Sequence, residues 1–205
     1  GGSTNITYKK IAALDNTGQD DVSDLPFSGW VVSRIVKDNG LGNTIKVQYN
    51  YEGGMYTSEE FRGFAKATET AYDSVTTHLF HQDDAKKGLE YETLMADSTA
   101  QPYAKIEMDF SSTTNNGYYT VALEKITSSM YDGIASNPKA SITSYDYDTY
   151  GNVIKIDEVG DPTTNVDDRW TDIEYFVDEG TWLHLPKRVR LFDSNGKLHD
   201  TENTY

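Results

Sequence analysis

The stretch SYDYDTYGNVIKI, residues 144–156, places a glycine turn between two runs in which apolar or aromatic residues alternate with polar ones. Tyr145 and Tyr147 are two residues apart, so on a β-strand their side chains share one face. The run after the turn, residues 153–156, is rich in the β-branched residues that favour strands. The stretch therefore predicts a β-hairpin, and it is the starting point for the fold class.

The turn in this stretch has a physical explanation. Asp148 begins it, and its carboxylate can accept hydrogen bonds from the backbone amides that follow. Gly151 tolerates the left-handed backbone that closes a short hairpin, and Asn152 tolerates a similar geometry. We interpret the motif as a structural turn that joins two strands.

A second copy of the motif occurs 45 residues further on, in FDSNGKLH, residues 192–199. An aromatic-Asp-x-x-Gly unit that repeats in a β-rich chain indicates stacked hairpins, each of which packs its aromatic ring on a neighbour. The predicted structural turn motif therefore comprises Tyr147, Asp148, Gly151, Asn152, Phe192, Asp193 and Gly196.

Further runs with strand periodicity alternate with turn residues along the whole chain. Strands are expected within residues 29–38, 43–52, 54–82, 102–110, 115–133, 139–161, 169–178 and 185–205. Acidic and alanine-containing patches hint at helix only at residues 58–70 and 85–94, and we expect little helix in either. The predicted fold class is all-β, with antiparallel strands and hairpins.

Domain boundaries are weakly marked in the sequence. Two polar stretches, residues 111–117 and 161–168, have the composition of loops, and the first is the better candidate for a junction. Two regions are therefore predicted, 1–110 and 111–205, with one continuous domain, 1–205, as the alternative.

Composition limits the function classes. The formal net charge of the 205 residues is −15, which argues against nucleic acid and anionic membranes as partners, because both require a basic face. The chain has no cysteine and no run of about 18 apolar residues, so neither a disulfide framework nor a membrane-spanning helix is predicted. The sequence starts without an initiator methionine or a signal peptide, and we interpret it as a fragment of a longer protein.

Two groups of carboxylates resemble calcium sites. The first joins Asp146 and Asp148 to Asp157 with the spacing of a calcium loop, but Tyr150 occupies a ligand position for which it is poorly suited. The second group lies in a polar stretch and has the character of a solvated surface; its members are Asp161, Asp167, Asp168 and Asp172. A plain turn and a plain surface are the favoured interpretations, and no metal is predicted.

Catalytic motifs are absent from the sequence. His78 and His81 are three residues apart, so on a strand they face opposite sides, which argues against a shared metal. The chain has no nucleophile elbow, no zinc-protease motif, no phosphate loop and no cysteine nucleophile. We therefore predict no catalytic, metal-binding or cofactor-binding residue and no enzyme; a hydrolase that uses two of the 33 carboxylates is the weakest alternative.

Aromatic residues make up 12% of the chain and admit two interpretations. Trp30, Trp170 and Trp182, together with the tyrosines, would suit a sugar-binding platform, although aromatic residues in a β protein more often pack against neighbours. The block EEFRGF, residues 59–64, is interpreted as a packing motif in which both phenylalanines are buried and the glycine allows close approach. Its members are Phe61, Arg62, Gly63 and Phe64, with ion pairs across strands from Glu59, Glu60 and Arg62.

Several of these stretches resemble a known family. SYDYDTYGNVIKI is similar to the YD repeat of Rhs-type proteins, from which the second copy departs by having Phe192 in place of tyrosine and Lys197 in place of asparagine. The segments LPFSGWVVSRIV, YNYEGGMY, EEFRGFAKATET and TTHLFHQDDAKKGLEYE resemble the region that leads into the YD repeats in the B component of bacterial toxin complexes. The likeness covers most of residues 1–110 and 140–200.

The resemblance implies a function that the residues alone do not. Such proteins wind their strands into a large hollow β shell that encloses a toxic polypeptide. The chain would then be a structural piece of a shell, secreted or at the bacterial cell surface, whose partners are the rest of the shell or other toxin-complex components. An extracellular module that binds a glycan or a protein remains the alternative.

Overall fold

The computed structural model describes residues 1–17, 25–57, 60–131, 135–178 and 180–205. In these residues thirteen β-strands, each antiparallel to its neighbour, follow one another across the sheet in the order of the chain. The predicted all-β fold is thereby confirmed. The elements are β1 (Ser3–Lys10), η1 (Ile11–Ala13), β2 (Trp30–Asp38), β3 (Thr44–Tyr56), β4 (Phe61–Ala71), β5 (Ser74–Phe80), β6 (Glu90–Asp97), β7 (Pro102–Asn115), β8 (Tyr118–Met130), β9 (Lys139–Tyr147), β10 (Val153–Val159), β11 (Arg169–Asp178), β12 (Leu183–Asp193) and β13 (Gly196–Glu202).

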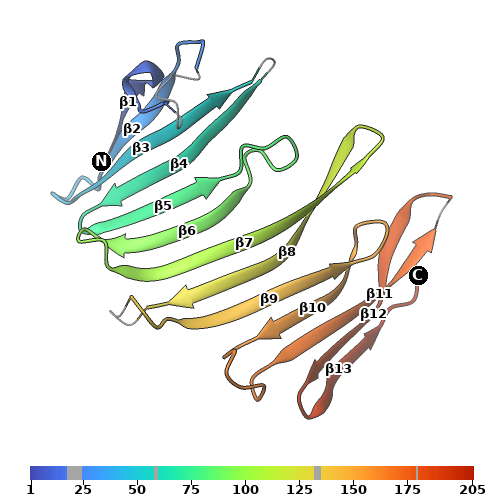
Figure 1. The fold of residues 1–205 in the computed structure, drawn as a ribbon. Coiled ribbons are helices and arrows are strands. Elements are labelled where there is room, and N and C mark those ends of the chain that lie inside the picture. The colour runs from blue at the N-terminus through green and yellow to red at the C-terminus, as the bar shows by residue number, and fades with distance from the viewer. Residues whose placement is uncertain (18–24, 58–59, 132–134, 179) are drawn as a thin grey trace. The chain divides into compact units, whose positions relative to one another are not determined.

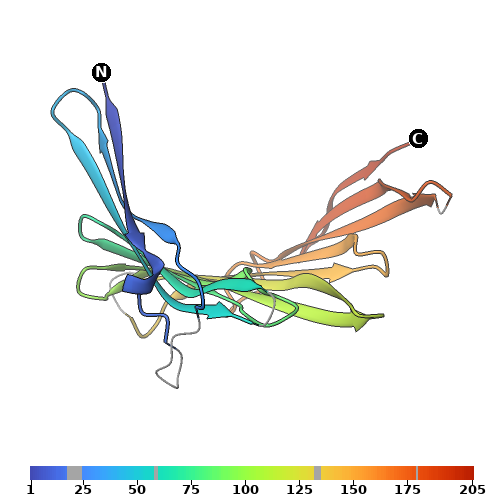
Figure 2. The same cartoon turned by 90° about the horizontal axis from the view of Figure 1, so that it is seen from above.

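The chain divides into two compact units, whose strands are labelled in Figure 1. Unit 1 contains residues 1–106 and 131–136, and unit 2 contains residues 107–130 and 137–205. Strands β1 to β6 and the start of β7 belong to unit 1, whereas the rest of β7 and strands β8 to β13 belong to unit 2. In unit 2 the strands form one layer, which Figure 2 shows from above.

Four stretches can be compared with the sequence-based expectations. Residues 61–71 form β4 and residues 90–97 form β6, so the weak hints of helix in these regions do not develop into helices, as expected. The polar stretch 111–117 is not a loop, because β7 continues to Asn115 and only the Asn-Gly pair after it turns the chain. Threonine-rich sequence suits a pleated strand when backbone pairing is available on either side. The first strand, β1, was not predicted.

The best-packed region of unit 1 forms where the segment after β1 folds over β3. Ile11 and Asn16 are buried, with 6% and 4% of their surfaces exposed. The Asn16 amide donates to the backbone oxygen of Ile11 at 2.8 Å, and Gly53 donates its N–H to the oxygen of Asp15 at 3.0 Å. Gly54 lies so close to this segment that an added Cβ would come within 2.7 Å of Asn16 Oδ1. The close approach therefore requires glycine at position 54.

Apart from this region, little of the described chain is buried. In the described residues, Ile11 and Ala96 are the only apolar side chains that are buried. By contrast, 22 large hydrophobic side chains are exposed. The accessible surface is 13357 Å². A compact monomer of 23.0 kDa would expose about 9,600 Å², and two separate compact units of half that mass about 11,600 Å². The chain therefore leaves more surface uncovered than a self-contained domain does.

None of the helical segments in the described residues has the length and apolar character needed to cross a membrane.

Candidate functional site

The turn between β9 and β10 is built by hydrogen bonds to one aspartate. Asp148 Oδ1 accepts from the backbone N–H groups of Tyr150 and Asn152, both at 2.9 Å, and its Oδ2 accepts from the Asn152 amide at 2.7 Å. Gly151 donates its N–H to the backbone oxygen of Asp148 at 3.1 Å and has a φ of +87°. This is a three-residue hairpin loop, in which a type I turn is followed by a left-handed residue. The turn joins β9 to β10, which pair from Tyr147 and Val153 onwards.

The electrostatics of Asp148 follow from these bonds. Partial burial acts to raise the pKa of its carboxyl, but the hydrogen bonds from Asn152 and Tyr150 outweigh burial, and the pKa lies below its ordinary value. The carboxylate is therefore charged at neutral pH, and the turn uses its acceptor capacity. At neutral pH it therefore accepts hydrogen bonds and carries no proton to donate.

Two further contacts connect this turn to the rest of unit 2. The Tyr147 hydroxyl donates to the backbone oxygen of Leu123 on β8 at 2.7 Å. On the other side, the Asn152 amide lies 2.8 Å from His184 Nδ1 on β12, and the His184 ring makes an edge contact with Tyr150 at 4.8 Å. The turn thus contacts β8, the neighbour of β9, and reaches past β11 to β12.

The side-chain hydrogen bonds of this turn recur at two places that the sequence analysis missed. The first of them has a different backbone, because its second residue, Gly40, also has a positive φ, of +73°. In the turn from β2 to β3, Asn39 Oδ1 accepts from the N–H groups of Leu41 at 2.8 Å and Asn43 at 3.2 Å. Asn39 also donates its own N–H to the Asn43 oxygen at 3.1 Å, as Asp148 does to Asn152 at 2.9 Å. Gly42, with a φ of +88°, stands where Gly151 stands.

The third example is the turn from β6 to β7. Asp97 Oδ1 accepts from the N–H groups of Thr99 at 2.8 Å and Gln101 at 3.0 Å. Asp97 donates its N–H to the Gln101 oxygen at 2.9 Å, and Ala100 occupies the left-handed position with a φ of +66°. The motif could have been found as Asp/Asn-x-x-Gly/Ala-Asn/Gln, a wider pattern than the one with an invariant aromatic and glycine.

The copy predicted at Phe192 has a different turn. Asp193 pairs directly with Gly196, so only two residues form the loop between β12 and β13. Asp193 Oδ1 accepts from the N–H groups of Asn195 at 2.8 Å and Gly196 at 3.1 Å. Phe192 stacks on Trp170 of β11, with ring centroids 5.3 Å apart and planes 8° from parallel. Asp193 therefore closes its hairpin as Asp148 does, but with a shorter loop.

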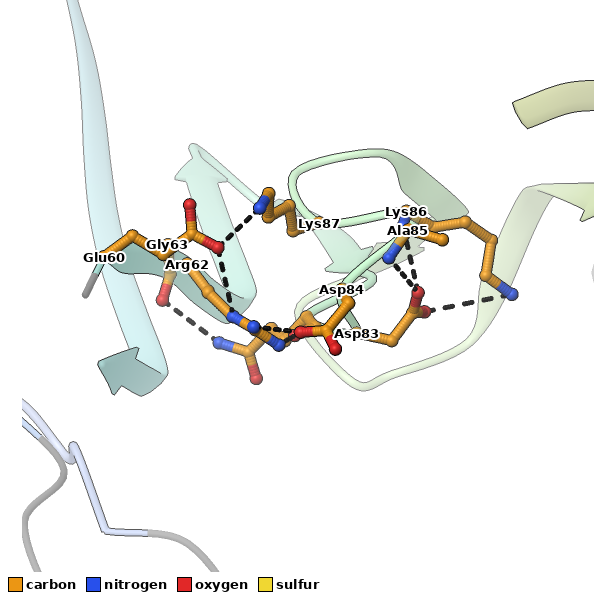
Figure 3. A network of polar contacts seen from close by, with 9 residues as sticks. Glu60, Arg62, Gly63, Asp83, Asp84, Ala85, Lys86 and Lys87 are labelled. Atoms are coloured by element: carbon orange, nitrogen blue, oxygen red, sulfur yellow. Dashed lines mark hydrogen bonds and ion pairs between the residues drawn. The ribbon is translucent and has the colours of Figure 1, made fainter. Parts of the chain in front are cut away.

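The EEFRGF block forms a network of polar contacts with the loop between β5 and β6 (Figure 3). Arg62 donates from Nη1 to the backbone oxygen of Gln82 at 3.0 Å and pairs through Nη2 with Asp84. Glu60 is 3.5 Å from Arg62 Nε and 2.5 Å from Lys87 Nζ. The network holds the loop of residues 81–89 against the start of β4. Glu59, which was also expected to form ion pairs, lies outside the described residues.

Gln82 ties the same loop to two glycine carbonyls. Its amide donates to the backbone oxygens of Gly53 at 2.8 Å and Gly63 at 3.0 Å. Gly63 has a φ of +82°, and an added Cβ there would meet nothing within 4 Å. The expected reason for this glycine, close approach, was wrong; its backbone conformation is what favours glycine.

The two phenylalanines of the block take part in an aromatic cluster. Phe61 contacts Phe27 and Phe64 edge to face, with ring centroids 5.3 Å and 5.6 Å apart, and Phe64 lies 5.1 Å from Tyr51. The expectation that Phe61 is buried was wrong, because 41% of its surface is exposed. A sheet with one uncovered face leaves the outward ring of such a cluster open to solvent or to a partner.

Charged side chains alternate in sign across one face of unit 2. Residues opposite one another in register share a face. The register places Asp146, Lys155, Asp172, Arg190 and Asp200 in one row across β9 to β13. Such a row stabilises the strand register, because a slip by one residue would remove the opposite charges from each other.

A bidentate ion pair beside this row joins β12 to β13. Arg188 donates from Nε and Nη2 to the two oxygens of Asp200, at 2.9 Å and 2.8 Å, and Lys197 lies 2.7 Å from the same carboxylate. The Arg188 guanidinium, followed by Lys197, holds the pKa of the Asp200 carboxyl well below its usual range. Arg190 in turn contacts Glu174 at 2.7 Å. These groups neutralise one another and serve as cross-strand contacts.

The remaining candidate ligands have protein partners of their own. His78 Nδ1 lies 2.7 Å from Glu90, and the His81 ring lies 4.8 Å from Tyr91. Asp157 pairs with Lys155 at 2.7 Å, and Asp161 accepts from Thr163 at 2.7 Å. Within the described residues, no group of three or more His, Asp or Glu side chains has the geometry of a metal site.

The three tryptophans lie in different settings. Lys10 Nζ is 5.6 Å from the ring centre of Trp30, and Trp170 stacks on Phe192 as described above. Trp182, at the tip of the β11–β12 hairpin, is 78% exposed and has a φ of +56°. It lines a cavity of about 220 Å³ with Tyr150, Val177 and His184. Trp30, which is 63% exposed, and Trp182 both have accessible rings, and of these two Trp182 lines a cavity.

Comparison with known proteins gives one family match and three solved chains of similar fold, two of which are described below. Residues 1–93 match the family model described as the insecticide toxin TcdB middle/N-terminal region. The chain is similar in fold to the crystal structure of TcdB2–TccC3–Cdc42, with 16% sequence identity, a TM-score of 0.71 and 94% of this chain covered. It is equally similar to the Photorhabdus luminescens Tc holotoxin pore with a mutation in TccC3, with 15% identity, a TM-score of 0.71 and 94% covered. No curated protein matches the sequence.

The family model covers only part of this chain, and this chain covers only part of each related structure. The chain spans 14% of the length of each structural relative. The first 93 residues thus resemble a segment of a toxin-complex B component, and the likeness in fold extends over nearly all of the chain.

Proposed function

We propose that this chain is a structural, non-enzymatic segment of the wall of a toxin-complex shell, which encloses or presents a toxic polypeptide. In this proposal residues 1–110 lead into the wall and residues 111–205 supply YD-type hairpins. The parent protein is secreted or displayed by a bacterium, and its partners are the rest of the shell and other toxin-complex components.

The observation that carries the proposal is the uncovered sheet. The described residues bury very few apolar side chains and expose 22 large hydrophobic ones. A chain of 205 residues has enough sequence to bury a substantial core when it folds alone. The exposed residues are therefore explained if other segments of a larger assembly cover them.

Two further features support a wall. Strands β1 and β13 are edge strands of the described sheet, and free edges pair readily with further strands. The conspicuous polar groups hold strands and turns together: Asp148 and Asp97 close hairpins, whereas Arg188 and Arg62 pair with carboxylates. A wall needs such contacts and no reactive group.

Protease protection of the full-length protein tests this proposal. The parent protein is produced together with the polypeptide that it encloses and is treated with proteinase K. We expect the enclosed polypeptide to resist digestion, and deletion of the β9–β10 hairpin, residues 140–159, to expose it. Val166→Ser is the matched control, because Val166 is 77% exposed in the neighbouring β10–β11 connection.

A point substitution separates loss of the wall from misfolding of the whole protein in that experiment. Gly151→Val strains the hairpin turn without deleting a strand, and we expect it to increase the rate of digestion while the protein remains soluble. Equal protection in the parent and in both hairpin variants would show that these strands are not part of the enclosing wall.

A second candidate function is the binding of a glycan, and one observation favours it. The cavity beside Trp182 combines two aromatic rings with His184 and has room for about one sugar ring. A glycan array with the 205-residue chain and with Trp182→Ala tests this function. Binding that the substitution abolishes would favour a lectin-like module over a purely structural segment.

A further inference from the structure

Strands β8 and β9 pair over only part of their lengths. Their register runs from Met130 and Lys139 to Lys125 and Ser144, and no pair is formed beyond this point although both strands continue. Residues 118–124 of β8 and 145–147 of β9 therefore have no direct strand partner on the sides that face each other. Figure 1 shows the tip of the β7–β8 hairpin lying apart from the β9–β10 hairpin.

A cavity of about 800 Å³ occupies this fork. It is lined by residues of β7, β8 and β9 and by the turn from Asp148 to Gly151. Neighbouring strands lie about 4.8 Å apart, packed layers about 10 Å apart, and each residue advances a strand by about 3.3 Å, so one strand residue fills about 160 Å³. Because Ser111, Thr113 and Asn115 of β7 also line it, part of the cavity lies over the β7–β8 hairpin, so the fork has room for at most about five residues of extended chain.

The contact of Tyr147 fixes the direction of the backbone groups along the fork. The Leu123 carbonyl accepts from the Tyr147 hydroxyl, so it points toward β9. Backbone groups of alternate residues point to the same side of a strand, so those of Val121 point into the fork as well. By the same alternation Asp146 points into the fork from β9, because Ser144 faces β8 where the pairing ends. Both sides of the fork present strand edges.

We propose that this fork is a binding site for an extended peptide with basic side chains, which inserts as a strand between β8 and β9. Only an extended polypeptide satisfies donors and acceptors on two facing strand edges at once, the mode known as β-strand addition. The Tyr147 hydroxyl takes the place of one ligand amide, because it already bonds to the Leu123 carbonyl. This proposal does not depend on the shell function.

The charge of the lining selects the peptide. Glu124, Asp146 and Asp148 line the cavity, and no lysine, arginine or histidine does. Lys125, at the end of the fork, is held by Asp109 at 2.6 Å. The register puts Asp146 on one face of the sheet and Glu124 on the other, because Lys125 and Ser144 are opposite one another. Side chains of an inserted strand also alternate between the two faces, so a peptide with lysine at every second position can place its charges on the face of Asp146. An acidic peptide would be repelled.

Fluorescence anisotropy with the 205-residue chain tests the site. The probe is a labelled heptapeptide that alternates valine and lysine, and we expect saturable binding that weakens as salt is added. One control peptide carries N-methyl groups on alternate amides, which removes the donors for one edge. Another has glutamate in place of lysine. We expect at least a tenfold loss of affinity with each.

Protein variants locate the binding. Val121→Pro removes a donor that points into the fork, and it should weaken binding at least fivefold. Tyr147→Phe frees the Leu123 carbonyl, and it should tighten binding about fivefold, as expected when a competing hydrogen bond is lost. Asp146→Asn should weaken binding, whereas Glu202→Gln on β13, which removes the same charge outside the cavity, should not.

Tyr147→Phe keeps the test decisive if the proline variant does not fold. Equal binding of the N-methylated peptide, or an affinity that Tyr147→Phe leaves unchanged, would assign the peptide to another edge and overturn the proposal. Failure of this test would leave the protease-protection result for the shell unaffected.

Discussion

Replacing Gly151 by valine tests whether the turn between β9 and β10 depends on its left-handed residue. Gly151 has a φ of +87°, and an added Cβ would meet nothing within 4 Å, so the substitution adds backbone strain and no clash. The left-handed region costs an ordinary residue about 1–2 kcal/mol and a β-branched one more. Reduced freedom of the unfolded chain offsets about 0.4–1 kcal/mol. We expect the free energy of unfolding to fall by about 1–2 kcal/mol.

Urea denaturation followed by tryptophan fluorescence measures this change, and two variants serve as controls. Gly151→Asn should cost less than Gly151→Val, because asparagine visits the left-handed region more readily. Ala100→Gly, at the equivalent position of the β6–β7 turn, should leave stability unchanged or raise it by up to about 1 kcal/mol. A valine variant within about 0.3 kcal/mol of the parent would refute the role given to the left-handed position.

Three other substitutions test the acceptor of the β9–β10 turn, the packed segment of unit 1 and the β12–β13 ion pair. Asp148→Ala should lower the free energy of unfolding by about 1 kcal/mol, since it removes the acceptor for the turn amides; unchanged urea midpoints would contradict this. Gly54→Ala should lower the free energy of unfolding by about 1–3 kcal/mol, because the new Cβ would come within 2.7 Å of Leu25 and of Asn16. A thermal melt identical to that of the parent would show that these side chains move aside freely. Because Arg188 holds the pKa of Asp200 below its ordinary value, this ion pair should stabilise the fold above about pH 4, and the stabilisation should be lost as the pH falls through the folded-state pKa. In Asp200→Asn the urea midpoint should therefore depend less on pH between about pH 2 and 4. The same pH dependence in the variant and the parent would show that the pair does not contribute to stability.

Strand periodicity in the sequence predicted most of the sheet, and it failed where residue preference and pairing disagree. The stretch 169–178 matches β11 because its apolar and polar residues alternate throughout. The hint of helix at 85–94 arose from its acidic residues and alanine, and both alanine and glutamate favour helices in isolation. In the structure Glu90 begins β6, which pairs with β5 over its whole length. Tertiary pairing overrides such weak preferences.

The turn motif was recognised too narrowly from the sequence. A search for aromatic-Asp-x-x-Gly finds Asp148 and Asp193, whose loops differ in length. It misses Asn39 and Asp97, whose turns repeat the hydrogen bonds of Asp148. The acceptor at the first position and a tolerated positive φ at the fourth define the turn, and Ala100 shows that the fourth residue need not be glycine. Backbone conformation at that position cannot be derived from residue identity alone.

Cryo-electron microscopy of the full-length protein tests the central claim most directly. The account predicts that these strands lie in the wall of a hollow shell, that further strands pair with β1 and β13, and that other segments cover much of the exposed apolar surface. A contradictory map would show residues 1–205 as a separate domain. In such a map the outer edges of β1 and β13 would have no strand partner, and the exposed side chains would lie in solvent.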